Sequence, residues 1–136
     1  MINSYNTSSQ TIDVNGLVEF NGTNVSTGCT VTQSGTTTFK LNKSGFYFVS
    51  FNANVATSAT AGDVTVQLNN NGTAVKGATA TFNSSATTAI GTIAFSTIIQ
   101  IRPSCCAINN QGNLTLENTG VSAIYSNANI TITKLC

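Results

Sequence analysis

The stretch Gly45–Val55, GFYFVSFNANV, decides the fold, because it combines bulky apolar residues with the alternation of a β-strand. Successive side chains of an extended strand point to opposite faces. One face of this strand would be apolar throughout, and its members are Tyr47, Val49, Phe51, Ala53 and Val55. The segment is therefore predicted to contribute these residues to the core of a β-sandwich, and the preceding segment to contribute Phe39.

The opposite face of the same strand begins aromatic and ends polar, with Phe46, Phe48, Ser50, Asn52 and Asn54. On a lone subunit the two phenylalanines would form an exposed patch, and such patches drive association. Two arrangements would cover them: contact with identical subunits, or a loop of the same chain. We expect the first, with Phe46, Phe48, Ser50 and Asn52 at a subunit interface.

Composition limits the fold class and the partners. The chain has 136 residues, enough for one domain with a core of its own, and Ser, Thr and Asn suit sheets and turns better than helices. Five basic and four acidic residues give a net charge of +1, so no nucleic-acid partner is expected. No run approaches the ~20 apolar residues of a membrane span, and no membrane insertion is expected.

Gly and Asn separate short strand-like runs along the chain, which predicts an all-β fold. Strands are predicted at residues 16–20, 29–32, 37–41, 45–55, 63–69, 73–82, 89–100, 112–118 and 128–135. Asn71-Gly72 predicts a tight hairpin turn between two of them. Residues 1–14 are polar and weakly patterned and are expected to form a short N-terminal arm, followed by a single domain at 15–136. Outward-facing loops are expected to carry Asn69, Asn70, Asn71, Asn109, Asn110 and Tyr125.

Catalytic and metal-binding chemistry find little support in the sequence. There is no histidine, which removes the commonest general base and zinc ligand. The four carboxylates are scattered and could not supply the six to eight oxygens that calcium prefers. We expect no enzyme activity, no metal and no cofactor.

The cysteines leave several pairings open. Cys105 and Cys106 are adjacent, Cys136 is the last residue, and neither a C-x-x-C pair nor a zinc ligand set is present. Cys136 could bridge to Cys105 or Cys106, or link two subunits, and the alternative is that no disulfide forms.

A neutral surface of amides and hydroxyls also suits hydrogen bonding to sugars, which makes a glycan a possible partner. Aromatic platforms for stacking are few: Tyr5, Tyr125 and Phe82 are the candidates, and there is no tryptophan.

Four stretches in a fixed order carry a family resemblance. They are VEFNGTNVSTGCTVTQSGTTTFKLNKSGFYFVSFNANV at 18–55, DVTVQLNNNGTAV at 63–75, GNLTLENTG at 112–120 and ANITITKL at 128–135. Together they resemble the globular head domain of complement and its tumour necrosis factor-like relatives, and the composition is similar to the bacterial and phage branch with its collagen-stalked spore-surface proteins. The resemblance implies an antiparallel jelly-roll β-sandwich of two packed sheets that assembles as a homotrimer with the inner sheets in contact.

These observations predict a non-enzymatic structural or surface-display module. Because Met1 lies close to the fold and no export signal follows it, we expect a trimeric phage virion protein on the virion surface, such as a head decoration, a capsid fibre or a tail-fibre knob. The N-terminal arm would dock it onto a larger assembly, and the protein would mediate attachment. The alternative is the head of a bacterial spore or cell-surface protein that acts as an adhesin or a glycan-binding lectin.

Overall fold

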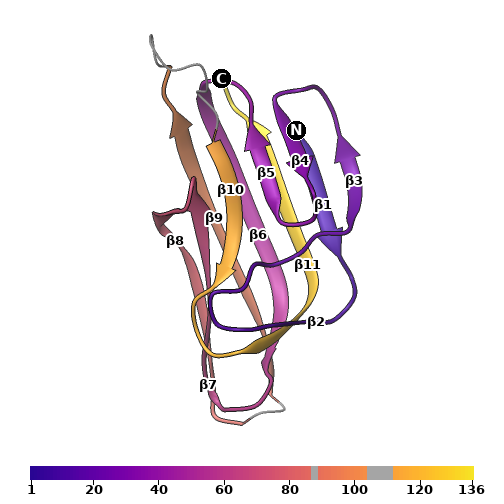
Figure 1. Ribbon diagram of the computed structural model, residues 1–136, viewed down its shortest axis with the longest axis vertical. Coiled ribbons are helices and arrows are strands. Elements are labelled where there is room, and N and C mark those ends of the chain that lie inside the picture. The colour runs from indigo at the N-terminus through magenta and orange to yellow at the C-terminus, as the bar shows by residue number, and fades with distance from the viewer. Residues whose placement is uncertain (87–88, 104–111) are drawn as a thin grey trace.

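The computed structural model describes residues 1–86, 89–103 and 112–136, and within them it contains only strands, turns and irregular segments. The eleven strands form two layers that face each other (Figure 1). The strands are β1 (Ile2–Asn6), β2 (Gln10–Ile12), β3 (Gly22–Ser26), β4 (Val31–Ser34), β5 (Thr38–Leu41), β6 (Gly45–Thr57), β7 (Gly62–Asn70), β8 (Thr73–Ser84), β9 (Ile90–Ile101), β10 (Gly112–Asn118) and β11 (Ala123–Lys134).

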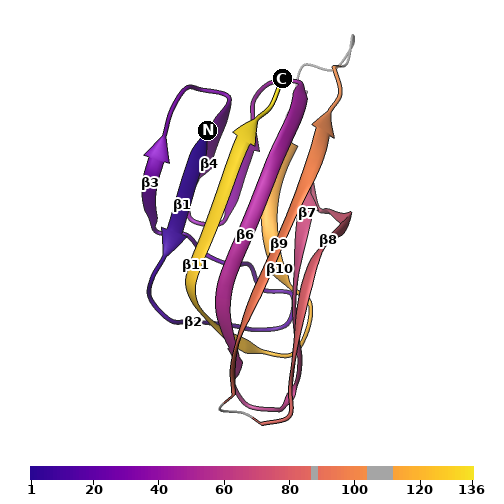
Figure 2. The same ribbon diagram turned by 180° about the vertical axis from the view of Figure 1, so that it is seen from behind.

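The two layers are antiparallel sheets with the strand order of a jelly roll. A six-stranded sheet has the order β3-β1-β11-β6-β9, with β2 paired to β11, and it faces the viewer in Figure 2. A five-stranded sheet has the order β4-β5-β10-β7-β8 and faces the viewer in Figure 1. Every described strand pair is antiparallel. The predicted all-β sandwich of two packed sheets is thereby confirmed.

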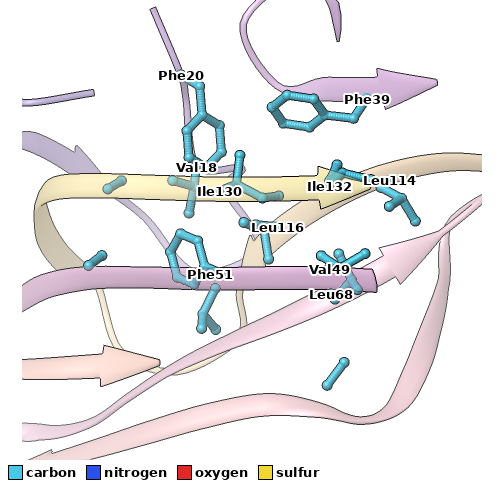
Figure 3. Packing of buried hydrophobic residues seen from close by; sticks show 14 of the residues in the cluster. Val18, Phe20, Phe39, Val49, Phe51, Leu68, Leu114, Leu116, Ile130 and Ile132 are labelled. Carbon is cyan, nitrogen blue, oxygen red and sulfur yellow. The ribbon is translucent and has the colours of Figure 1, made fainter. Parts of the chain in front are cut away.

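The core lies between the sheets and is built from the alternation seen in the sequence. Tyr47, Val49, Phe51 and Val55 of β6 and Phe39 of β5 are all buried. The Phe20 ring meets Phe39 edge-on at 5.5 Å and Phe51 at 6.2 Å, between the centroids, and Figure 3 shows these rings among the surrounding aliphatic side chains. These contacts join residues from both sheets and from the irregular segment between them.

The beginning of the chain differs from the expected free arm. Strand β1 pairs with β11 from Ile2↔Ile132 to Asn6↔Ala128 and with β3 on its other side, and β2 also pairs with β11. Ile2 and Ile12 are buried in the core. Residues 2–12 are therefore part of the six-stranded sheet, because their few apolar side chains complete its inner surface.

The segment 16–20 also differs from its prediction. It is not a strand, although Leu17 forms an isolated bridge with Glu117. Val18 and Phe20 nevertheless point into the core, and the Val18 amide donates to the Leu116 carbonyl oxygen. Their apolar alternation thus reflects burial between the sheets rather than membership of one.

Candidate functional site

The solvent side of the six-stranded sheet, called here the open face, carries large apolar side chains that are exposed. Phe46 of β6 is 42% exposed, and on β9 Ile98 and Ile90 are 59% and 77% exposed. Val25 of β3 adds a fourth. No large apolar side chain is exposed on the strands of the five-stranded sheet in the described part of the chain. The two outer surfaces of the sandwich are therefore chemically different.

The expected interface residues of β6 all lie on the open face. Phe48 is half-buried and lies between Ile98 of β9 and Thr133 of β11 in the sheet register. Ser50 is half-buried and Asn52 is exposed, and Asn52 pairs with Ala94 and Asn129. An apolar group on β6 and β9 is thus continuous with a more polar surface toward β11 and β1.

Charge is almost absent from this sheet. Its six strands contain one ionisable side chain that is charged at neutral pH, Lys134 at the end of β11. The strands of the five-stranded sheet carry four, which are Lys40, Asp63, Lys76 and Glu117. The cores of protein interfaces are depleted in charged residues, so the open face has the composition of a surface that another protein chain covers.

One margin of the open face is the edge strand β9, which carries no charged residue or proline. Strand β9 pairs with β6 on one side only, and it runs for twelve residues, IGTIAFSTIIQI, without a charge or a proline. Free edges of this kind template pairing with other chains unless charged residues, proline or a bulge blunt them. The neighbouring edge strand β8 has such features, with Lys76 and Gly77, whose φ is +81°.

A cluster of amide side chains occupies the other half of the open face. Nδ2 of Asn3 donates to Oδ1 of Asn129 at 2.9 Å, to Oγ1 of Thr131 at 2.7 Å and to the Ile130 carbonyl oxygen at 3.2 Å. Oδ1 of Asn3 accepts from Nδ2 of Asn24 at 2.8 Å. Asn3 therefore fixes the orientation of the amides on β3 and β11.

An open cleft of about 450 Å³ lies beside this cluster. It is lined by Tyr5, Thr7, Asn24, Asn127, Ala128 and Asn129. Strand β11 is bulged there, since its register with β6 shifts between Ser126 and Asn129, and Asn127 has a φ of +49°. The bulge exposes Asn127 at the rim of the cleft.

The expected outward loop residues divide into three groups. Asn71 is exposed at the tip of the β7–β8 hairpin, and its φ of +52° is that of the predicted tight turn. Asn69 is buried and donates from Nδ2 to Oε2 of Glu117 at 2.7 Å, while Oδ1 of Asn70 is buried without a partner in the described residues. Asn109 and Asn110 lie outside the described residues.

Tyr125 was expected to face outward, and that expectation is wrong. It is fully buried on β11, and its hydroxyl donates to Oδ1 of Asn118 at 2.9 Å. Burial raises the pKa of the Tyr125 phenol. Tyr125 therefore cannot serve as a platform for a ligand.

The remaining aromatic and cysteine candidates can also be placed. Phe82 is half-buried against Gly91 of β9, so its ring closes the seam between the two sheets. Cys136 and Cys29 are exposed free thiols. Cys105 and Cys106 lie outside the described residues.

Neither a metal-binding cluster nor a membrane-spanning helix is present in the described residues. In residues 1–86, 89–103 and 112–136, no three His, Cys, Asp or Glu side chains gather where they could hold a metal ion. The same residues contain no helix that is long and apolar enough to cross a membrane.

Comparison with known proteins places the chain in a structural context. The family described as "BclA C-terminal domain" matches residues 2–136. No curated protein matches the chain. Among solved structures, murine APRIL at pH 8.5 is 9% identical over 98% of this chain and 97% of its own, with a TM-score of 0.69. The vertex protein P5 of PRD1 is 20% identical over 99% of this chain and 96% of its own, with a TM-score of 0.60. At these identities the likeness to solved structures shows the fold alone.

Proposed function

The chain belongs to the BclA C-terminal domain family, and from this premise we propose that it is a homotrimeric, non-enzymatic head displayed on a biological surface. The family membership and the jelly-roll neighbours support a structural surface module with a tumour necrosis factor- and complement-like fold. The trimer and its setting are the parts that we propose.

The observation that carries the proposal is the chemistry of the open face. Exposed Phe46 and Ile98 lie on a sheet with a single charged side chain, at and beside the uncharged edge strand β9. In water these groups favour association. A second copy that covers the apolar half of the face would shield β9 as well, because that strand borders the same surface.

The open face favours a cyclic arrangement of identical subunits. The apolar half of the face and the β9 edge are different surfaces of one chain, so one copy can present its edge to the face of the next. Contacts of this head-to-tail kind form closed rings when the rotation closes. Three copies would complete such a ring and leave the five-stranded sheets on its outside.

The setting that we propose is the surface of a virion, where the head would serve decoration or attachment. The vertex protein P5 of PRD1 shares the fold, so the architecture is compatible with this setting. The alternative is the head of a spore or cell-surface protein, which the family membership favours. The native gene distinguishes the two settings, because a collagen-like or coiled stalk encoded upstream would support the second.

Light scattering on the purified protein at micromolar concentration, with reductant present, tests the assembly. The expected mass is about 42 kDa, three times the 14.0 kDa of one chain. A monomer at this concentration would overturn the trimer. It would mean that a single subunit is stable in water with its open face exposed to solvent.

A further inference from the structure

The cleft beside the amide cluster combines the groups that recognise a sugar, and we propose that it binds a neutral saccharide. Of the three aromatic residues that the sequence offered as platforms, Tyr125 is buried and Phe82 packs over Gly91. Tyr5 is half-buried and lines the cleft. It is the one tyrosine of the described chain that can meet a ligand there.

The Tyr5 ring lies over Gly22, its partner in the β1–β3 register. A Cβ atom at Gly22 would lie 2.4 Å from Cζ of Tyr5, so the ring occupies the space that any other residue at position 22 would fill. The absence of a side chain at position 22 thus lets the ring lie against the sheet in the unliganded chain. Pre-positioned side chains reduce the entropy that binding costs.

The amides of the cleft are also oriented in advance. Asn24 and Asn129 are tied through Asn3, with distances of 2.8 Å and 2.9 Å. Each amide carries one acceptor oxygen and two N–H donors, and this network uses only part of that capacity. Asn127, at the bulge, has no hydrogen bond from its side chain to another described residue. Donors and acceptors therefore remain free at the rim of the cleft.

A pyranose matches this arrangement of groups. One face of a sugar ring is made of C–H groups that can lie on the Tyr5 ring, while the hydroxyls at its edge both donate and accept hydrogen bonds. The cleft volume of about 450 Å³ is in the range of small-molecule sites. None of the described residues that line the cleft is charged, so a neutral sugar is favoured over a sialic acid, a uronic acid or a phosphorylated ligand.

The site belongs to one chain and goes beyond the trimer proposal. The cleft lies on β1, β3 and β11, while the exposed Phe46 and Ile98 lie on β6 and β9 at the other side of the sheet. Loss of sugar binding and loss of assembly can therefore be measured separately.

The test is a titration of the purified protein with methyl glycosides of galactose, mannose and N-acetylglucosamine, with sialic acid as the charged comparator. Side-chain amide signals of the asparagines are followed by NMR. We expect at least one neutral glycoside to shift the Asn24 and Asn129 amides with a dissociation constant on the order of 1 mM, a value typical of small polar ligands. Sialic acid should cause no comparable shift.

Three variants assign the binding to the cleft. Tyr5→Ala should weaken it about tenfold or more through loss of the platform, and Tyr5→Phe should retain it. Gly22→Ala should weaken it although no group of the site is removed, because the new methyl group displaces the Tyr5 ring. Asn83→Ala, on the exposed side of β8, is the matched control and should bind like the wild type.

The light-scattering mass and the denaturation midpoint of each variant are measured alongside, so that loss of the fold is recognised. Absence of binding by every neutral glycoside in a folded protein would overturn the proposal, and so would equal binding by Tyr5→Ala and Tyr5→Phe. Selective binding of sialic acid would overturn the neutral class. None of these results bears on the trimer, which the mass alone decides.

Discussion

The hydroxyl of Tyr125 on β11 donates a hydrogen bond to Oδ1 of Asn118 on β10, 2.9 Å away in the interior of the sandwich. Nδ2 of Asn118 donates in turn to the Ile12 carbonyl oxygen at 3.0 Å and to the Val121 carbonyl oxygen at 2.9 Å. One buried amide thus joins the end of β2, the β10–β11 connection and a core tyrosine. Asn118 and Tyr125 are both fully buried, so bulk solvent does not reach this hydrogen bond.

Asn118→Ala should therefore destabilise the protein by about 2–4 kcal/mol, because it removes the buried acceptor of the Tyr125 hydroxyl and a donor to two backbone carbonyls. Tyr125→Phe should cost less, about 1–2 kcal/mol, because only Oδ1 of Asn118 loses its donor. Urea unfolding at neutral pH measures both values. Equal costs below 0.5 kcal/mol would show that the interaction contributes little to stability.

Alkaline pH should lower the stability of the fold through its buried phenols. Burial raises the pKa of Tyr47 and of Tyr125 above the ordinary value of 10.0. The unfolded chain then loses these protons first as the pH rises, so the contribution is complete below pH 10 and is lost above it, by up to ~1.4 kcal/mol per pH unit for each tyrosine.

Urea unfolding between pH 8 and pH 11.5 checks this dependence. The Tyr125→Phe variant should show a shallower decline above pH 10 than the wild type, because one of the two groups is gone. Identical declines in the two proteins would mean that Tyr125 ionises in the folded state as readily as in the unfolded one.

Charge on the apolar half of the open face should dissociate the proposed trimer. Ile98 is 59% exposed, so Ile98→Asp costs the single chain little, yet a buried unpaired carboxylate in the assembly is strongly unfavourable. Phe48→Asp should act in the same way. Both should give a light-scattering mass near the 14.0 kDa of one chain.

The matched control is Thr81→Asp, at an exposed position of β8 in the five-stranded sheet, which should leave the mass unchanged. Trimers that persist in both Ile98→Asp and Phe48→Asp would show that the subunits meet through a different surface.

Gly45 is the first residue of strand β6, and both its backbone conformation and its close neighbours disfavour any other residue there. Its φ is +137°, and a Cβ atom there would lie 2.4 Å from the carbonyl oxygen of Cys136. Gly45→Ala should therefore cost about 2 kcal/mol or more. Gly28→Ala is the control, since Gly28 also has a positive φ, +73°, but open space around it. Equal destabilisation of the two variants would show that the contact with Cys136 is relieved without cost.

Cys136→Ser should leave both the mass and the urea midpoint unchanged, because the thiol is exposed and forms no disulfide with another described residue. Non-reducing electrophoresis gives the complementary measurement. A dimer band in the wild type that is absent from Cys136→Ser would reveal a bridge between subunits instead.

Period-two patterning made most of the fold predictable. Residues 63–69 and 112–118 alternate between polar and apolar side chains, residues 45–55 keep one face apolar throughout, and each segment lies in a strand of the structure. Strand β1 was missed because its inward side chains after Ile2 are Ser4 and Asn6, which are polar but buried. Oγ of Ser4 donates to Oε1 of Gln33 at 2.8 Å, a partner that no sequence spacing indicates.

Tyr125 shows how one irregularity reverses a side-chain direction. A constant period of two would place Tyr125 on the same face as Asn129 and Thr131, which face outward. The bulge at Asn127 inserts a residue and shifts the phase, so Tyr125 points into the core while the later residues keep their direction. Apolar content alone does not reveal a bulge of this kind.

The apolar half of the open face could be predicted from the sequence, and the half that carries the cleft could not. Phe46 and Phe48 stand out as unexpected aromatics on one strand. The cleft joins Tyr5, Asn24 and Asn129 from three strands, and only the completed sheet brings them together.

The central position of β11 sets the order in which the molecule can fold. This strand pairs with β1, β2 and β6, and it is the last strand of the chain. During synthesis, β1 and β6 emerge from the ribosome long before the strand that separates them. The six-stranded sheet therefore cannot be completed until β11 has been made, and early release of the chain invites aggregation. A truncation that removes the last dozen residues should therefore abolish the whole six-stranded layer, rather than fray one end of it.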